Sequence, residues 1–183
     1  MQIMDLRRIG QIELGSKVVV SDPCYNLGTW CMGVLYDVKP GEYSCFINCI
    51  ISDWGNRIKE LFIIHKSSPV CPELVSELMD FEVGVDSATA GIFDYLYYEK
   101  THEDRENFDK WFNEKVIGMY DDGKDMNLST NITDQKGVLC TSGYGDGGYD
   151  CFVHRNSVGQ IDAIKVVFIN DKEESEGDCY SLV

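Results

Sequence analysis

Residues 39–65, which read KPGEYSCFINCIISDWGNRIKELFIIH, decide the fold of this chain. Two long apolar segments, residues 42–51 and 57–65, are separated by the turn-forming letters DWGN. The first segment alternates, because four of its side chains fall on one face of an extended chain: Tyr43, Cys45, Ile47 and Cys49. This pattern predicts two long antiparallel strands joined by a short turn.

The flanking sequence extends this pattern into a larger sheet. Lys39-Pro40-Gly41 has the chemistry of a type II turn, so residues 32–38 should form a strand that folds back on residues 42–51 as part of a meander. Further apolar segments predict strands elsewhere: residues 17–21, 81–85, 137–142, 149–155 and 160–169. We therefore expect a mainly β fold, built as an antiparallel sheet, a sandwich or a barrel-like α+β arrangement.

One segment has helical periodicity instead. Within residues 103–115, apolar side chains recur at spacings of three and four at Phe108, Trp111 and Phe112, and this stripe should pack on the sheet. We expect a single β-rich domain over residues 1–169 with this helical insertion near residues 100–118. The acidic, polar composition of residues 170–183 favours a disordered tail.

Net charge and hydropathy exclude several classes of partner. The formal charge of −15 repels phosphate backbones and the 16 basic residues are scattered, so a nucleic acid polymer is excluded while a basic protein partner stays open. No run of 18 apolar residues is present, which predicts no membrane span. The first residues lack the apolar core of a signal peptide, so we expect a cytoplasmic protein with its eight cysteines reduced.

Three short loops follow strands and combine Asp with Gly, Pro or small residues: residues 21–25 (SDPCY), 86–91 (DSATAG) and 144–149 (YGDGGY). Each has a purely structural explanation. Asp22 before Pro23 favours an Asx-turn, and Asp86-Ser87 could cap a helix. Asp146-Gly147 is the favoured pair for a type I′ hairpin turn, which would place Gly147 in the left-handed region.

The functional alternative is that the three loops converge. Asp22, Asp86 and Asp146 would then form an acidic cluster walled by tyrosines, and the glycines would let a ligand approach the backbone. Carboxylates suit a divalent cation such as Ca²⁺ or Mg²⁺, whereas the bare amides of a glycine loop suit a phosphate, and both chemistries stay open. The candidate ligand-binding residues are Asp22, Tyr25, Asp86, Ser87, Tyr144, Gly145, Asp146, Gly147 and Tyr149.

The same motifs carry a resemblance. A strand that ends in DPCY, an internal DSxxAGIFD and a late GDGxY followed by an apolar strand resemble a little-characterised group of bacterial and phage proteins, which includes a family of unknown function. The resemblance covers most of the chain outside residues 100–136. It implies a shared β-rich fold and a bacterial or phage origin, and it assigns no catalytic residue.

Catalytic signatures are weak. A Cys–His pair would have to join Cys24 to His65, His102 or His154, and no spacing supports one. We therefore expect a non-catalytic binding protein for a small polar ligand or a protein partner, in line with a sequestering role in phage–host or toxin conflict that only the resemblance suggests. The alternatives are a metal-dependent hydrolase that uses Asp22, Asp86 and Asp146, and a decoy that blocks proteins with its acidic surface.

Overall fold

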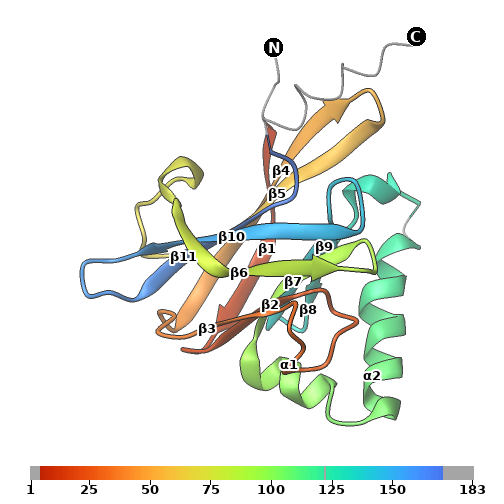
Figure 1. Cartoon of the computed structure of the whole chain (residues 1–183), viewed down its shortest axis with the longest axis horizontal. Coiled ribbons are helices and arrows are strands. Elements are labelled where there is room, and N and C mark those ends of the chain that lie inside the picture. The colour runs from red at the N-terminus through yellow and green to blue at the C-terminus, as the bar shows by residue number, and fades with distance from the viewer. Residues whose placement is uncertain (1–4, 122, 171–183) are drawn as a thin grey trace.

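Two antiparallel sheets make up most of the molecule, a computed structural model that describes residues 5–121 and 123–170 (Figure 1). The prediction of a mainly β fold is confirmed, and neither sheet closes into a barrel. The acidic segment expected to be a tail lies, apart from Asn170, outside the described residues.

The larger sheet has six strands in the order β1-β4-β5-β11-β10-β6. Their bounds are β1 (Asp5–Leu14), β4 (Gly41–Ser52), β5 (Gly55–His65), β11 (Ile161–Val167), β10 (Gly147–Arg155) and β6 (Glu77–Val85). The predicted pair of long strands is confirmed, since β4 and β5 are antiparallel and Ser52 faces Gly55 across the turn.

The smaller sheet has five strands in the order β3-β2-β7-β9-β8. Their bounds are β3 (Gly33–Leu35), β2 (Val18–Ser21), β7 (Thr89–Asp94), β9 (Gly137–Thr141) and β8 (Thr130–Thr133). This arrangement corrects the expected meander, because β3 pairs with β2 in this sheet and the partner of β4 on its other side is β1. Strand β1 comes from residues that the sequence analysis left unassigned.

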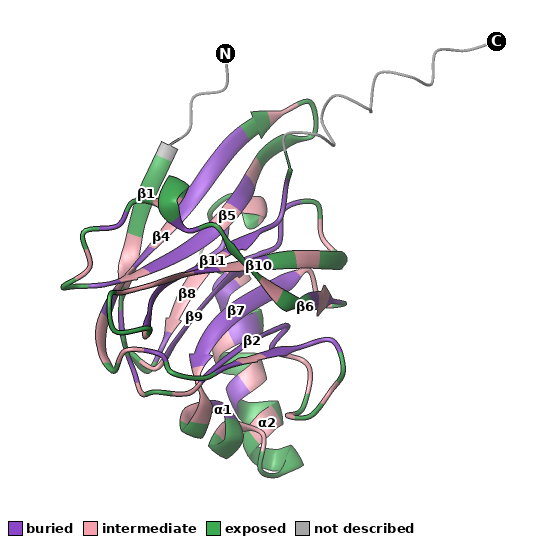
Figure 2. Cartoon of the chain, turned by 60° about the vertical axis from the view of Figure 1, so that its left-hand side comes forward, coloured by how far each residue is buried: buried purple, intermediate pink, exposed green. Residues whose placement is uncertain are grey.

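A shared core lies between the sheets. Buried aliphatic side chains of the six-stranded sheet, such as Ile63 and Ile164, belong to one cluster with Val20 and Ile92 of the five-stranded sheet. Figure 2 shows buried stretches along strands of both sheets, while much of the helix surface is exposed. Alternation along each strand builds this core, because every second residue of a half-buried strand faces inward.

Helices cover the outer side of the five-stranded sheet (Figure 1). They are α1 (Tyr95–Thr101) and α2 (Arg105–Trp111), followed by a π-helical turn (Phe112–Val116), and 3₁₀ turns occur at Ile117–Tyr120, Met126–Leu128 and Pro72–Leu74. The predicted amphipathic helix is present, and Trp111 packs in a cluster with Val19, Phe93 and Leu139 of the sheet. None of the described helices combines the length and apolar composition that a membrane crossing requires.

The described cysteines, all except Cys179, are free thiols. Most of them are buried, and Cys45, Cys49, Cys140 and Cys151 belong to the shared core. They act there as small apolar residues.

Candidate binding cleft

The Asp22 carboxylate joins two of the three loops. Asp22 directly follows strand β2 and is 0% exposed. Its Oδ2 atom accepts hydrogen bonds from the backbone N–H groups of Asp86 at 2.8 Å and Ser87 at 2.7 Å. Its Oδ1 atom accepts from the Ser87 hydroxyl at 2.7 Å and from the Cys24 N–H at 2.8 Å. Asp22 therefore holds the SDPCY loop against the DSATAG loop, and its oxygens face protein donors rather than a ligand.

Asp146 brings in the third loop. Its Oδ1 atom accepts a hydrogen bond from the backbone N–H of Ala88 at 3.1 Å. The Ala88 carbonyl in turn accepts from the N–H of Ser142 at 3.1 Å. Ala88 has a φ of 53°, a left-handed conformation that these contacts hold in place. The structure thus brings the three loops together, which agrees with the hypothesis that the three Asp-containing loops converge.

The glycine-rich loop is not a hairpin, which corrects the predicted type I′ turn. Strands β9 and β10 belong to different sheets, so the loop carries the chain from the smaller sheet to the larger one. The positive φ values lie at Gly143 (53°) and Gly145 (113°), whereas Gly147 already begins β10 and is not among the positive-φ glycines. A turn closes earlier, where the Gly145 N–H donates to the Ser142 carbonyl at 2.7 Å.

The two tyrosines of this loop have different surroundings from those expected. The Tyr149 hydroxyl donates to the Gly145 carbonyl at 2.5 Å and to the Ser142 carbonyl at 3.2 Å, so this ring supports the loop. The Tyr144 ring is exposed and lies 5.9 Å from the Arg57 guanidinium. Neither of them lines the cleft described next.

A cleft of about 460 Å³ opens beside the joined loops. One side comes from the segment between β2 and β3, and the other comes from the end of β6 and the start of β10. Its lining residues are Tyr25, Trp30, Cys31, Glu82, Gly84, Val85, Asp86, Asp146, Gly147 and Gly148. The lining thus carries three carboxylates and two aromatic rings, and no Lys or Arg.

Several contacts hold these walls in place. The Tyr98 hydroxyl of α1 donates to the Tyr25 carbonyl at 2.6 Å, which ties the β2–β3 segment to the helices. The Gly84 N–H donates to the Cys31 carbonyl at 2.8 Å and joins the two sides of the cleft. Gly148 leaves room for the Glu82 side chain, which a Cβ atom at that position would overlap.

Trp30 and Glu82 line the candidate cleft and were not predicted from the sequence as ligand-binding residues. Trp30 is 90% exposed, although a tryptophan in a loop between apolar strands is more often a core or rim residue. Glu82 lies on the exposed face of β6, so the alternation of residues 81–85 contains the signal that its side chain points outward. The sequence did not indicate which loop lies opposite the Glu82 side chain.

Two groups in the joined loops, the Tyr25 hydroxyl and the Cys24 thiol, have raised pKa values. The Tyr25 hydroxyl donates to Asp86 Oδ2 at 2.8 Å, and this hydrogen bond raises the pKa of Tyr25. Burial, reinforced by the hydrogen bond to Asp22, raises the pKa of the Cys24 thiol well above its usual range. Cys24 is therefore a poor source of thiolate.

The histidines also rule out the Cys–His pair considered from the sequence. Each ring nitrogen of His102 contacts a backbone carbonyl, Nε2 that of Pro23 at 3.0 Å and Nδ1 that of Tyr98 at 2.9 Å. His65 contacts Ser67, and His154 contacts Asp162. No histidine is thus placed to activate Cys24.

The three aspartates do not fit a divalent cation. Both oxygens of Asp22 already accept bonds from protein donors, which would have to be broken for a metal to bind. Across residues 5–121 and 123–170, no group of three or more His, Cys, Asp or Glu side chains is arranged to hold a metal ion. The donor set therefore gives no support to metal-assisted hydrolysis at Asp22, Asp86 and Asp146.

Comparison with known proteins identifies one related family. A family model described as "Protein of unknown function (DUF4241)" matches residues 72–166, just over half of the chain. The match includes the β6 and β10 side of the cleft and leaves out Tyr25 and Trp30. No curated protein and no solved structure matches the chain.

Proposed function

The chain belongs to the DUF4241 family of proteins of unknown function, and we propose that it is a binding protein whose cleft holds a basic protein partner without catalysing a reaction there. The observation that carries this proposal is the composition of the lining. Glu82, Asp86 and Asp146 stand beside the exposed indole of Trp30 without a Lys or Arg among them. Such a site favours a Lys or Arg side chain, which carboxylates attract and an aromatic face can stack on.

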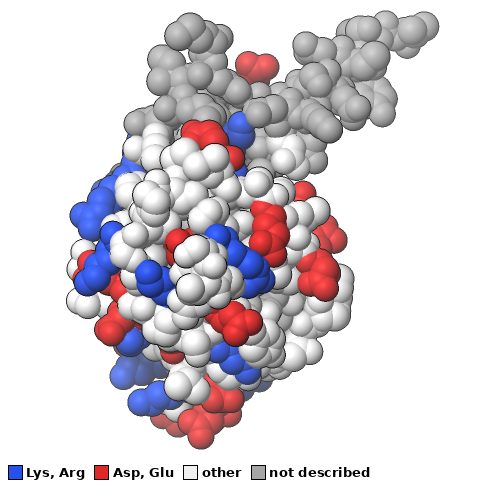
Figure 3. Space-filling model, turned by 90° about the vertical axis from the view of Figure 1, so that its left-hand side faces the viewer, with Lys and Arg blue, Asp and Glu red and all other residues white. Residues whose placement is uncertain are grey.

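The charges of the cleft are available to a partner. No ion pair joins Glu82, Asp86 or Asp146 to a Lys or Arg of the described residues. The cleft lining has no basic side chain, whereas the face shown in Figure 3 carries both basic and acidic side chains. The net charge of −15 would also speed the approach of a basic partner.

The exposure of Trp30 favours a protein over a small ligand. An indole that is 90% exposed contributes little to enclosing a small molecule, and an approaching protein surface could bury it. Tryptophan is among the residues that most often dominate the binding energy of protein interfaces. The cleft between two loops and a strand end offers such a surface a concave acidic centre.

Calorimetric titration with an arginine-rich peptide tests the proposal. We expect binding of deca-arginine, and none of the matching deca-citrulline, which keeps the shape and loses the charge. Trp30→Ala and Glu82→Gln should each weaken binding by about fivefold, which corresponds to about 1 kcal/mol. Trp54→Ala is the control for an exposed indole elsewhere, and Asp80→Asn is the control for an acid on β6 outside the cleft.

Three outcomes would contradict the proposal. Equal affinity for the citrulline peptide would show that charge is not recognised. Equal affinity in Trp30→Ala and in the controls would show non-specific attraction by the net charge. Binding of free arginine as tight as that of the peptide would replace the protein partner with a small cationic ligand.

A further inference from the structure

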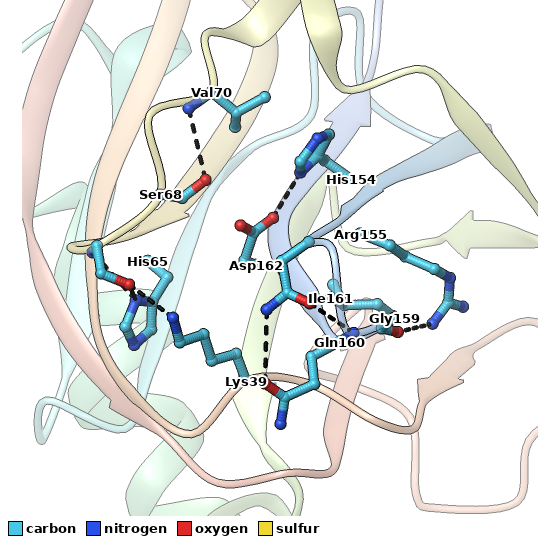
Figure 4. Close-up of polar contacts among 12 residues, drawn as sticks. Lys39, His65, Ser68, Val70, His154, Arg155, Gly159, Gln160, Ile161 and Asp162 are labelled. Atoms are coloured by element: carbon cyan, nitrogen blue, oxygen red, sulfur yellow. Dashed lines mark hydrogen bonds and ion pairs between the residues drawn. The ribbon is translucent and has the colours of Figure 1, made fainter.

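A second pocket, separate from the cleft, lies where β5 ends. It measures about 580 Å³, and its lining includes Lys39, His65 and Ser67. Figure 4 shows the side chains of Lys39 and His65 converging at this end of the sheet. Ser67 is exposed, so its hydroxyl can be reached from the pocket.

The contacts around Ser67 are all satisfied by one arrangement of protons. The Ser67 backbone N–H donates to His65 Nδ1 at 3.1 Å, so Nδ1 is an acceptor and the ring proton belongs on Nε2, which lies 3.3 Å from the Pro40 carbonyl. The Ser67 Oγ atom is 2.9 Å from the same Nδ1, and its hydroxyl must therefore donate. The Lys39 ammonium donates to Ser67 Oγ at 2.6 Å.

The imidazole is fixed in this orientation. His65 is 6% exposed, and its ring packs edge-on against the Tyr43 ring with centroids 5.2 Å apart. Gly41 has a φ of 134°, and a Cβ atom there would come within 2.8 Å of His65 Nε2. Backbone and aromatic ring thus hold Nδ1 towards the hydroxyl, which is the pre-organisation a general base requires.

His65 is also in the form that can accept a proton. Burial, followed by the charge of Lys39, lowers the pKa of His65 below its ordinary value of 6.5. Lys66 lowers this pKa further, while the Pro40 carbonyl and Asp162 oppose the shift. Near pH 7 the imidazole is therefore neutral.

We propose that Ser67 is an activated nucleophile that attacks small carboxylic esters in this pocket. The Ser67 Oγ atom forms a bond to the carbonyl carbon as its proton passes to His65 Nδ1 and the π electrons of the carbonyl group move to the carbonyl oxygen. When that electron pair re-forms the C=O bond, the bond to the alkoxy oxygen breaks, and the departing alkoxide takes the proton from Nδ1. Water then hydrolyses the acyl-Ser67 ester by the same proton transfers and releases the carboxylic acid. The Lys39 ammonium, which donates to Oγ, favours loss of the hydroxyl proton during attack.

The rival explanation is that His65 and Ser67 only close the turn after β5. Residues two apart in a turn often share a hydrogen bond, and such a contact gives the hydroxyl no special reactivity. The ammonium of Lys39 separates the two explanations, because it comes from a distant part of the chain and a turn does not require it.

Covalent labelling tests the proposal. An alkyl fluorophosphonate should add its phosphonyl group to Ser67 with loss of fluoride, and peptide mapping by mass spectrometry locates the adduct. Ser67→Ala should abolish the adduct and the hydrolysis of p-nitrophenyl acetate. Ser68→Ala is the matched control, since its hydroxyl accepts a bond from the Val70 N–H and it should leave both signals unchanged.

Two further variants identify the partners of the nucleophile. His65→Gln and Lys39→Met should each slow labelling by about a hundredfold or more, a size typical of losing a base or a charge stabiliser. In the unaltered protein the labelling rate should rise as His65 loses its proton, and the midpoint of this rise should lie below the ordinary histidine pKa of 6.5. Lys39→Met keeps the test informative if His65→Gln unfolds, which a thermal melt would reveal.

Three results would overturn the proposal. The first is the absence of an adduct on Ser67 while a serine hydrolase is labelled in parallel. The others are equal labelling of Ser67 and Ser68, and an unchanged labelling rate in Lys39→Met. Any of these would leave His65 and Ser67 as a turn contact.

Discussion

At the scale of single residues, Asp22 shows how one side chain can organise a site without contacting a ligand. The expected Asx-turn is present, because Asp22 Oδ1 accepts from the Cys24 N–H. The bonds from Asp86 and Ser87 come from residues more than 60 positions away in the sequence. A carboxylate is needed here, since four donors point at its two oxygens.

Replacing Asp22 should therefore destabilise the protein strongly. Asp22→Asn puts an amide donor opposite N–H and O–H donors, so at least one buried donor loses its acceptor. We expect the free energy of unfolding to fall by about 3 kcal/mol, measured by urea denaturation.

Asp146→Asn is the matched control for that experiment. Asp146 is exposed, its one contact to Ala88 N–H is 3.1 Å long, and Asn keeps an oxygen that can accept it. The loss should stay below about 1 kcal/mol. Equal losses in the two variants would show that the buried Asp22 contacts stabilise the protein no more than the single exposed contact of Asp146.

At the scale of elements, the segment that connects β9 to β10 contains Gly143, where only glycine fits without strain, and Gly147, where a larger residue can be accommodated. Gly143 has a φ of 53°, and a Cβ atom there would lie 2.9 Å from Phe168 Cβ and 3.0 Å from Ile169 Cγ1. Gly143→Ala should therefore lower the free energy of unfolding by about 2 kcal/mol, from backbone strain and crowding together.

Gly147→Ala provides the comparison, since a Cβ atom on Gly147 would meet only the Tyr149 ring at an ordinary 3.4 Å. A change within about 0.5 kcal/mol is expected. A large loss at Gly147 with none at Gly143 would reverse the assignment of the turn.

The helical segment makes a second prediction at this scale. Trp111 is 6% exposed and its Nε1–H donates to the Tyr97 hydroxyl at 2.7 Å. Trp111→Ala should cost about 3–5 kcal/mol in thermal or urea unfolding, because it leaves a large cavity between helices and sheet. Trp54→Ala, at a position that is 77% exposed, should cost less than about 1 kcal/mol, and similar losses in both would place Trp111 outside the core.

At the scale of the whole molecule, the two sheets depend on each other. They share one core cluster, and Asp22 ties the end of β2 to the turn between β6 and β7, which belong to different sheets. The family match from residue 72 to residue 166 covers strands of both sheets and leaves out strands of both. Neither sheet can bury its inner face without the other.

This interdependence predicts a single cooperative unfolding transition. In the double variant Trp30→Phe with Trp54→Phe, fluorescence reports Trp111 alone, while far-UV circular dichroism follows the strands. The two urea midpoints should coincide. A separate, earlier fluorescence transition would mean that the helical side unfolds independently of the sheets.

The sequence by itself determined that residues 42–51 and 57–65 are extended and that residues 103–115 contain a helix, whereas it gave no prediction for β1, β7, β8 or α1. Alternation over residues 42–51 and the spacing of Phe108, Trp111 and Phe112 are local signals, because they record which face of an element is apolar. The three Asp-containing loops were also visible, since each stands at the end of an apolar segment.

Only the tertiary structure decided which strands pair and which side chains meet in the cleft. The apolar face of a strand predicts that the strand is buried, but it does not predict which strand pairs with it. For this reason the sequence predicted a hairpin of β9 and β10, although these strands lie in different sheets. For the same reason, Asp22 became a buried structural carboxylate while Trp30 and Glu82 became the exposed lining of the cleft. Burial and contact between distant segments arise from packing the whole chain, and local sequence patterns do not encode them.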